Sequence, residues 1–468
     1  MLFNSWTFVL FFAVVLAGYR LADRLGGFRL QNRLLLVASY IFYAAWDWRF
    51  CGMLVAISVV DWSCGLAMGR VPERRRKYVL AVSIASDLGL LCYFKYANFL
   101  VANTGAVLRL LGHDPDWPTL HIILPVGISF IVFKSMSYTI DVYRGVIRPE
   151  RHLLDYALFV AFFPDLVAGP IIRARTVLAQ LGAPRRVGPE MLAEGVWLIL
   201  LGYFLKIVVA DNLSGMVNAI FAEPAPTSDA EALLGIYGFA FQILGDFSGY
   251  SSIAIGVARL LGFRLPPNFA HPYLVTSPRD FWRNWHISLS TWLRDYVYVS
   301  LGGNRGGTAR TCRNLMITML LGGLWHGAAW TFVLWGAFQG ALLVLQRLAA
   351  PLWPARAPSA AGGPALRLLA ILAMFHLTCF GWLIFRASSV PQIGRFLGAL
   401  AVAPAPAPGS GWGRTARSSP CSPRPPCSPT GSCAGPTARS RRWRCRGPAA
   451  GRPRRRWPSA SRPSAISA

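Results

Sequence analysis

The stretch MITMLLGGLWHGAAWTFVLWGAFQGALLVL occupies residues 316–345 and contains one ionisable side chain, His326, among thirty positions. A helix needs about 20 apolar residues to cross the hydrocarbon core of a bilayer, so this stretch is long enough to span it. An ionisable group at that depth costs free energy unless a partner, a water-filled cavity or a function retains it. The stretch therefore predicts a membrane protein with a histidine inside the bilayer.

His326 has two interpretations. Imidazole titrates near neutral pH, so it can accept and return a proton in a reaction. A lone membrane histidine can also be structural, hydrogen-bonded to a carbonyl of a neighbouring helix. Gly322 and Gly323 lie one turn before it and permit close approach of a backbone or a ligand, Trp325 adjoins it, and Trp330 is expected one turn on, walling a pocket. These surroundings favour a reaction site.

The composition indicates an all-α polytopic membrane protein. Mean hydropathy is +0.42, 54% of the 468 residues are hydrophobic and 14% are charged. Because some apolar segments are interrupted by Pro or Gly, we expect about 9–11 of them to form transmembrane helices. The apolar segments lie near residues 5–22, 34–50, 51–69, 78–100, 119–140, 153–172, 192–221, 232–261, 285–302, 314–346 and 367–386.

The net charge of +27 does not indicate nucleic-acid binding, because of where the charge lies. Thirteen arginines and no acidic residue fall within residues 411–468, and most of the remaining excess lies in short loops between apolar segments. Such loops face the cytoplasm. The basic loops include residues 20–33 and 70–77, so residues 34–69 are predicted to form a hairpin with Asp47 and Trp48 at its outer tip.

Two apolar segments, residues 153–172 and 285–302, each lie between basic groups assigned to the same side. An even number of crossings must separate such groups, so each segment is predicted to enter the membrane and turn back. Pro164, Asp165 and Gly169 break the first segment. Irregular backbone at membrane depth is tolerated only against protein or a wet cavity, so we expect a cavity that opens to the cytoplasm.

The chain is expected to divide into a membrane-embedded domain, residues 1–403, and a tail, residues 404–468. The tail is rich in Pro, Arg, Ser and Ala with few aliphatic residues, a composition that predicts disorder. It is either a cationic tail for anionic lipid or the out-of-frame translation of a GC-rich gene, and we favour the second. The nine cysteines show no spacing typical of a metal site or a disulfide framework, so neither is expected.

Residues 279–305 read RDFWRNWHISLSTWLRDYVYVSLGGNR. On a helix, Arg283, His286, Ser290 and Arg294 share one face, with guanidinium groups available to phosphate at the inner interface. The alternative is a plain interfacial anchor, which spacing alone favours. The apolar face of this helix would consist of Phe281, Trp285, Leu289, Trp292, Leu293 and Tyr296.

Several charged residues fall within apolar segments. Asp246 is well inside a run that begins at Leu233, and we expect it to be a structural residue paired with an Arg or a Tyr rather than a catalytic one. The same reasoning applies to Lys95, Lys134 and Lys206, although snorkelling suffices near the end of a segment.

The motifs at residues 279–305 and 321–336 together resemble the membrane-bound O-acyltransferase superfamily. The resemblance extends over about residues 1–400 and is strongest to the bacterial branch with alginate O-acetylation and teichoic-acid D-alanyl transfer proteins. The tail departs from the family, which usually ends in further hydrophobic helix. Supporting motifs are LPVGISFIVFKSMSYTIDVYRG (124–145), FFPDLVAGPI (162–171), DFSGYSSIAIG (246–256) and FGWLIFRAS (380–388).

The resemblance implies a many-helix bundle with re-entrant segments and a central tunnel that narrows to a thin wall. An essential histidine at that wall corresponds to His326, and His286 matches a second polar position, so we expect both to be catalytic. Residues that bind the donor or substrate are expected to be Arg283, Asn284, Trp285, Ser290, Arg294, Asp295, Trp325 and Trp330.

The resemblance also implies a function, a donor and partners. We expect an O-acetyltransferase of the bacterial inner membrane that moves an acyl group from a cytoplasmic thioester, such as acetyl-CoA or a loaded acyl carrier, toward a polysaccharide hydroxyl. No bound cofactor and no nucleic acid are expected. The expected partners are an extracytoplasmic O-acetyltransferase and polysaccharide machinery.

Two other functions stay open. The protein could be a non-catalytic acyl relay or scaffold in an exopolysaccharide modification complex, in which the histidine is structural. It could also be a secondary transporter, although the sequence shows no internal repeat of the kind such proteins carry.

Overall fold

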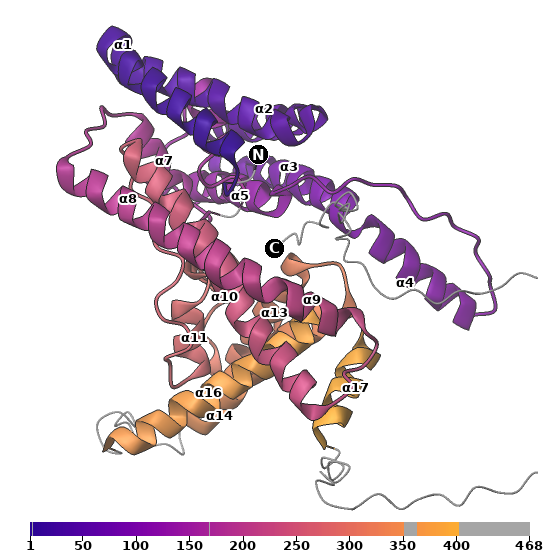
Figure 1. Ribbon diagram of the computed structural model, residues 1–468. Helices are drawn as coiled ribbons and strands as arrows, with labels where there is room; N and C mark the ends of the chain where they lie inside the picture. Colours follow the sequence, from indigo (N-terminus) through magenta and orange to yellow (C-terminus); the bar gives the residue numbers. More distant parts are fainter. Residues whose placement is uncertain (2, 168, 351–362, 402–468) are drawn as a thin grey trace, which may run out of the picture. The chain divides into compact units, whose positions relative to one another are not determined.

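A computed structural model describes residues 1, 3–167, 169–350 and 363–401, and all regular secondary structure in these ranges is helical (Figure 1). The helices are α1 (Trp6–Asp47), η1 (Trp48–Phe50), α2 (Cys51–Arg70), α3 (Glu73–Leu91), η2 (Cys92–Tyr96), α4 (Ala97–Leu110), α5 (Ile128–Tyr143), α6 (Leu153–Ala161), α7 (Ala174–Leu181), α8 (Pro189–Tyr203), η3 (Phe204–Asp211), α9 (Asn212–Ala222), α10 (Asp229–Leu260), α11 (Pro278–Asn284), α12 (Ile287–Trp292), η4 (Leu293–Tyr298), α13 (Gly307–His326), α14 (Trp330–Ala349), α16 (Gly363–Arg386) and α17 (Val390–Ala401).

Six helical runs in the described residues are long and apolar enough to cross a membrane, which confirms the all-α membrane fold. The number of runs is not the number of membrane crossings, because a run can contain breaks. In the first run α1 is interrupted at Gly27, whose φ is +62°, and η1 separates α1 from α2. The runs are Trp6–Arg70, Glu73–Leu110, Pro189–Ala222, Asp229–Leu260, Trp330–Ala349 and Gly363–Arg386.

The turn between α1 and α2 lies where the charge pattern predicts the tip of a hairpin. Asp47 ends α1 and its carboxylate accepts a hydrogen bond from the Arg49 backbone N–H at 3.0 Å. The same carboxylate pairs with the Arg49 guanidinium at 2.5 Å. The helix is therefore broken at residues 47–50, where the tip of the hairpin over residues 34–69 is predicted.

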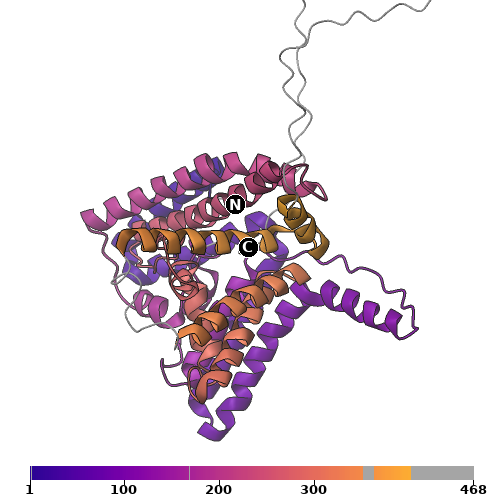
Figure 2. The ribbon, with the colours of Figure 1, turned by 90° about the horizontal axis from the view of Figure 1, so that it is seen from below.

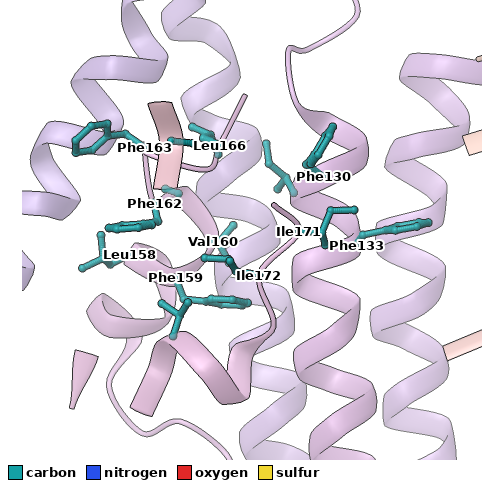
Figure 3. Close-up of a cluster of buried hydrophobic side chains, with 14 of the residues drawn as sticks. Phe130, Phe133, Leu158, Phe159, Val160, Phe162, Phe163, Leu166, Ile171 and Ile172 are labelled. Atoms are coloured by element: carbon teal, nitrogen blue, oxygen red, sulfur yellow. The ribbon is translucent and has the colours of Figure 1, made fainter. Parts of the chain in front are cut away.

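The segment 153–172 is too irregular to be a single spanning helix. Helix α6 has nine residues, which at 1.5 Å per residue extend about 14 Å, less than half of the ~30 Å hydrocarbon core. The chain after Ala161 is non-helical yet fully buried at Phe162, Phe163 and Leu166. Figure 3 shows these side chains packed between helices, together with Phe130 of α5. The predicted break in this segment is confirmed.

A buried ion pair ties this non-helical stretch to α5. The Lys134 ammonium lies 2.8 Å from a carboxylate oxygen of Asp165, and the two side chains are 1% and 0% exposed. Lys134 also lies over the Phe159 ring, 5.4 Å from its centroid. Lys134 therefore has a specific partner inside the protein, and its side chain does not snorkel to a surface.

Buried hydrophobic side chains form two clusters. The first joins α1, α2, α5 and α6 with the stretch after α6 and with α12. The second joins α10, α11, α14, α16 and α17. Helix α10 is in extensive contact with α8, which runs beside it (Figures 1 and 2). The predicted disordered tail, residues 404–468, lies outside the described residues.

Candidate functional site

The stretch 316–345 forms a helical hairpin and not one continuous helix. Helix α13 ends at His326, Gly327 is extended with φ −167° and ψ 157°, and α14 begins at Trp330. The two helices pack tightly because Gly323 faces Gly336: a Cβ on Gly323 would lie 3.1 Å from the Gly336 Cα and would collide with the Phe332 carbonyl. His326 therefore lies at the turn of the hairpin.

His326 is surrounded by aromatic rings. Its imidazole centroid lies 4.9 Å from that of Trp325, 5.1 Å from that of Trp335 and 5.2 Å from that of Phe385, each in an edge-to-face arrangement. The residue is partly exposed, while its Nδ1 is buried without a hydrogen-bond partner in the described part of the chain. This ring nitrogen therefore has an unused hydrogen-bonding capacity within the described part of the chain.

Trp330 does not wall this pocket, and that prediction is wrong. The side chain is 58% exposed, and its indole N–H donates to Asn103 Oδ1 at 2.8 Å. The helix ends between His326 and Trp330, so the two residues are not one turn apart. Trp335, which the sequence analysis did not single out, contacts His326 from α14 instead.

The segment 279–305 is also broken, although its predicted apolar face is confirmed as buried. Helix α11 ends at Asn284 and α12 starts at Ile287, with the left-handed His286 between them, so the prediction of a continuous helix is wrong. The six buried apolar residues are Phe281, Trp285, Leu289, Trp292, Leu293 and Tyr296.

His286 has a backbone conformation that is rare for a residue with a side chain. Its φ of 42° and ψ of 55° are left-handed, and the side chain is 1% exposed. Such strain is held in place by its surroundings and clusters at functional sites. The imidazole Nδ1 accepts a hydrogen bond from the Leu289 N–H at 3.3 Å, which caps α12. Its Nε2 is buried without a partner among the described residues.

The two histidines share one aromatic neighbour. The Trp325 ring lies 5.7 Å from the His286 ring and 4.9 Å from the His326 ring. The site is at the junction of the two hydrophobic clusters, because Trp325 belongs to the first and Trp335 to the second. Two unpaired imidazole nitrogens thus lie within one aromatic neighbourhood.

The cap at His286 leads to a stability prediction. Replacing His286 with alanine removes the acceptor for the Leu289 N–H, and loss of such a cap lowers the free energy of unfolding by about 0.5–2 kcal/mol. The matched variant His286→Asn retains an acceptor and a residue type that tolerates the left-handed region. Thermal unfolding in detergent should rank wild type and Asn above Ala. Equal melting temperatures for Asn and Ala would contradict the cap.

The other predicted residues of α11 and α12 are largely committed to local contacts. Arg283 is exposed and pairs with Asp280 at 3.3 Å, and the Asn284 side chain donates to the Asp280 carbonyl at 2.7 Å. The Ser290 hydroxyl donates to the Trp282 carbonyl at 2.5 Å. The first two contacts lie within α11, and the third joins α12 to α11. His286, by contrast with the prediction, does not share an exposed face with Arg283 and Arg294.

Trp285 and Asp295 lie at different ends of the broken segment. Trp285 is buried against Trp382, with 4.7 Å between ring centroids. Asp295 bridges Arg294 at 2.7 Å and Arg173 at 2.5 Å. Burial raises the pKa of the Asp295 carboxyl, but the hydrogen bonds from the two guanidinium groups outweigh it and lower this pKa overall. The carboxylate therefore stays charged, and Arg294 remains 61% exposed.

Asp246 pairs with a lysine. The Lys206 ammonium lies 2.5 Å from an Asp246 carboxylate oxygen and 2.8 Å from Asp211, and it also lies over the Tyr250 ring. The expected partner type, Arg or Tyr, is thus wrong. Among the residues that the structure describes, no group of three His, Cys, Asp or Glu side chains suits a metal ion.

Comparison with known proteins identifies the family. The profile of MBOAT, the membrane-bound O-acyltransferase family, matches residues 146–380, which include both histidines. The chain belongs to the membrane-bound O-acyltransferase family. It is therefore a multi-pass membrane O-acyltransferase, as the resemblance in the sequence implies.

Three relatives of this membrane-bound O-acyltransferase show the range of activities named within the family. The probable alginate O-acetylase AlgI of Azotobacter vinelandii is 43% identical over 407 residues, which are 86% of this chain and 78% of that protein. The peptidoglycan O-acetyltransferase of Helicobacter pylori is 32% identical, with coverage of 83% and 78%. The teichoic acid D-alanyltransferase of Bacillus subtilis is 25% identical, with coverage of 77% and 92%. The expected bacterial branch is confirmed.

Proposed function

We propose that this protein takes an acetyl or other acyl group from a cytoplasmic thioester and transfers it across the bacterial inner membrane to a polysaccharide hydroxyl. The supporting observation is the pair of histidines around Trp325, in a family of O-acyltransferases. Each has a buried ring nitrogen without a partner in the part of the chain that the structure describes. A relative that is 43% identical is named a probable alginate O-acetylase, so an alginate-like exopolysaccharide is the proposed acceptor.

In the proposed reaction neutral His326 is the general base. The imidazole takes the proton of the attacking hydroxyl while the hydroxyl oxygen bonds to the thioester carbonyl carbon. The resulting oxyanion collapses, the carbon–sulfur bond breaks, and the thiolate takes the proton back from the imidazolium. The products are an ester and a free thiol, so protons and electrons balance. His286 holds the donor or orients the broken helix.

The proposed direction follows from charge. Arg144, Arg173 and Arg294 gather around Asp295 and Tyr296 at the end of η4. An excess of positive charge beside membrane helices favours the cytoplasmic side. We therefore assign this end to the thioester donor, whether acetyl-CoA or a loaded acyl carrier. The opposite side would face the acceptor, an extracytoplasmic O-acetyltransferase and the polysaccharide machinery.

The test is vectorial transfer in sealed proteoliposomes. Thioester labelled in its acyl group is added to one side and polysaccharide is enclosed on the other. Label should reach the polysaccharide in vesicles whose cytoplasmic face meets the thioester, and transfer should continue in detergent, where no gradient exists. A transporter would stop working in detergent. A relay would consume thioester only after the extracytoplasmic transferase is added, and a scaffold would not consume it; either result rejects direct transfer.

A further inference from the structure

Lys95 holds the end of the helix that carries His326. It belongs to the π-helix η2, and its ammonium donates to the Trp325 carbonyl, 230 positions along the chain, and to the Ser129 hydroxyl at 3.0 Å. The next residue, Tyr96, donates from its hydroxyl to the Leu324 carbonyl at 2.5 Å. Both carbonyls belong to the last turn of α13, immediately before His326.

These contacts suit the chemistry of a helix end. The last four carbonyls of an α-helix lack partners within the helix, and the partial negative charge there attracts a cation. Segments of π-helix inside α-helices occur frequently at functional sites. Lys95 and Tyr96 therefore position the final turn of α13, and through it the imidazole, from a distant part of the sequence.

The helix end offers only a partial negative charge, and a neutral donor could also bind the same carbonyl, so positioning alone does not require the full charge of Lys95. Lys134 and Lys206 lie opposite carboxylates, whereas in the described ranges no carboxylate lies within ion-pair distance of Lys95. An ammonium has three N–H donors, and two are used here. Its nitrogen lies 5.7 Å from the ring centroid of Trp325, the residue directly before His326. A cation within a membrane segment without a counter-charge is costly and indicates a function.

We infer that Lys95 is a further catalytic residue, which turns its third N–H and its charge toward the oxyanion formed beside His326. This inference rests on the proposed function. When the hydroxyl attacks, the carbonyl π electrons move onto the oxygen, and the negative charge appears where the ammonium is already fixed. In this step Lys95 donates a hydrogen bond, and His326 carries the transferred proton. Such preorganised donors act strongly in a site that excludes water.

Charge and hydrogen bonding can be separated at this one position. Lys95→Gln keeps N–H donors for the carbonyl without charge, Lys95→Arg keeps both, and Tyr96→Phe removes only the neutral hydrogen bond. The full-length protein is assayed for kcat and for the KM of the thioester. Loss of one oxyanion donor lowers kcat by about 10²–10³-fold. We expect that loss in Lys95→Gln with little change in KM, partial recovery in Lys95→Arg, and a far smaller loss in Tyr96→Phe.

Lys77→Gln is the matched control, because Lys77 is exposed, and it should behave as wild type. Full activity of Lys95→Gln alongside transfer that depends on His326 overturns the inference while the proposed function stands. Absence of His326-dependent transfer in the wild type overturns both. A second measurement needs no turnover: a phosphonate analogue of the donor, which mimics the oxyanion, should bind wild type more tightly than a thioether analogue. Lys95→Gln should lose that preference, and an unchanged preference overturns the inference.

Discussion

Replacing His326 with alanine is expected to lower acyl transfer by about 10²–10⁴-fold, the range that general acid–base catalysis contributes. The imidazole lies at the turn of the α13–α14 hairpin, and its Nδ1 has no partner among the described residues. Alanine there removes the group proposed to take the hydroxyl proton. The measurement is initial transfer rate at saturating thioester and acceptor, in protein that is inserted in the membrane and retains the wild-type melting temperature.

A second histidine provides a matched control for this prediction. His376 of α16 also lies in a candidate membrane helix, but its Nδ1 is 2.7 Å from the Leu372 carbonyl and the residue is exposed. His376→Ala should transfer acyl groups at the wild-type rate. Undiminished transfer by folded His326→Ala would contradict a role as base, and equal losses in both variants would indicate a general effect of removing membrane histidines.

Replacing Lys134 with methionine is expected to lower the free energy of unfolding by about 3–5 kcal/mol, because Asp165 is then left as an unpaired buried charge. The pair joins α5 to the non-helical stretch after α6, so its loss should loosen that stretch. The double variant Lys134→Met/Asp165→Leu removes both charges and should recover most of the stability. Thermal and denaturant unfolding in one detergent would measure this. A double variant as unstable as the single one would contradict it.

Periodicity and charge predicted much of the fold. The reversal at Asp47 followed from basic loops on both sides of one hairpin, and the break near Pro164 followed from residues that cannot continue a helix. The buried face of residues 281–296 followed from helical spacing and survives the break, because α11 and α12 each keep their apolar residues toward the interior.

The missed features depend on contacts between distant segments. Residues 327–329 are Gly and Ala, which have no strong turn signature, and the hairpin closes because Gly323 meets Gly336. The left-handed His286 follows from the packing of Trp285 in one cluster and Leu289 in the other. Lys95 resembled a snorkelling residue, because its partner at Trp325 is remote in sequence.

The contact between Gly323 and Gly336 also indicates which other residues a sequence needs in order to orient the His326 imidazole as it is oriented here. Successive residues of an α-helix are rotated by about 100° about its axis. The interval of three positions between Gly323 and His326 therefore sets the direction of the His326 side chain relative to α14. A distant chain that retains a histidine but has lost the glycine three positions before it would aim the ring elsewhere. We therefore expect remote homologues with this candidate site to keep the interval between glycine and histidine as well as the histidine itself.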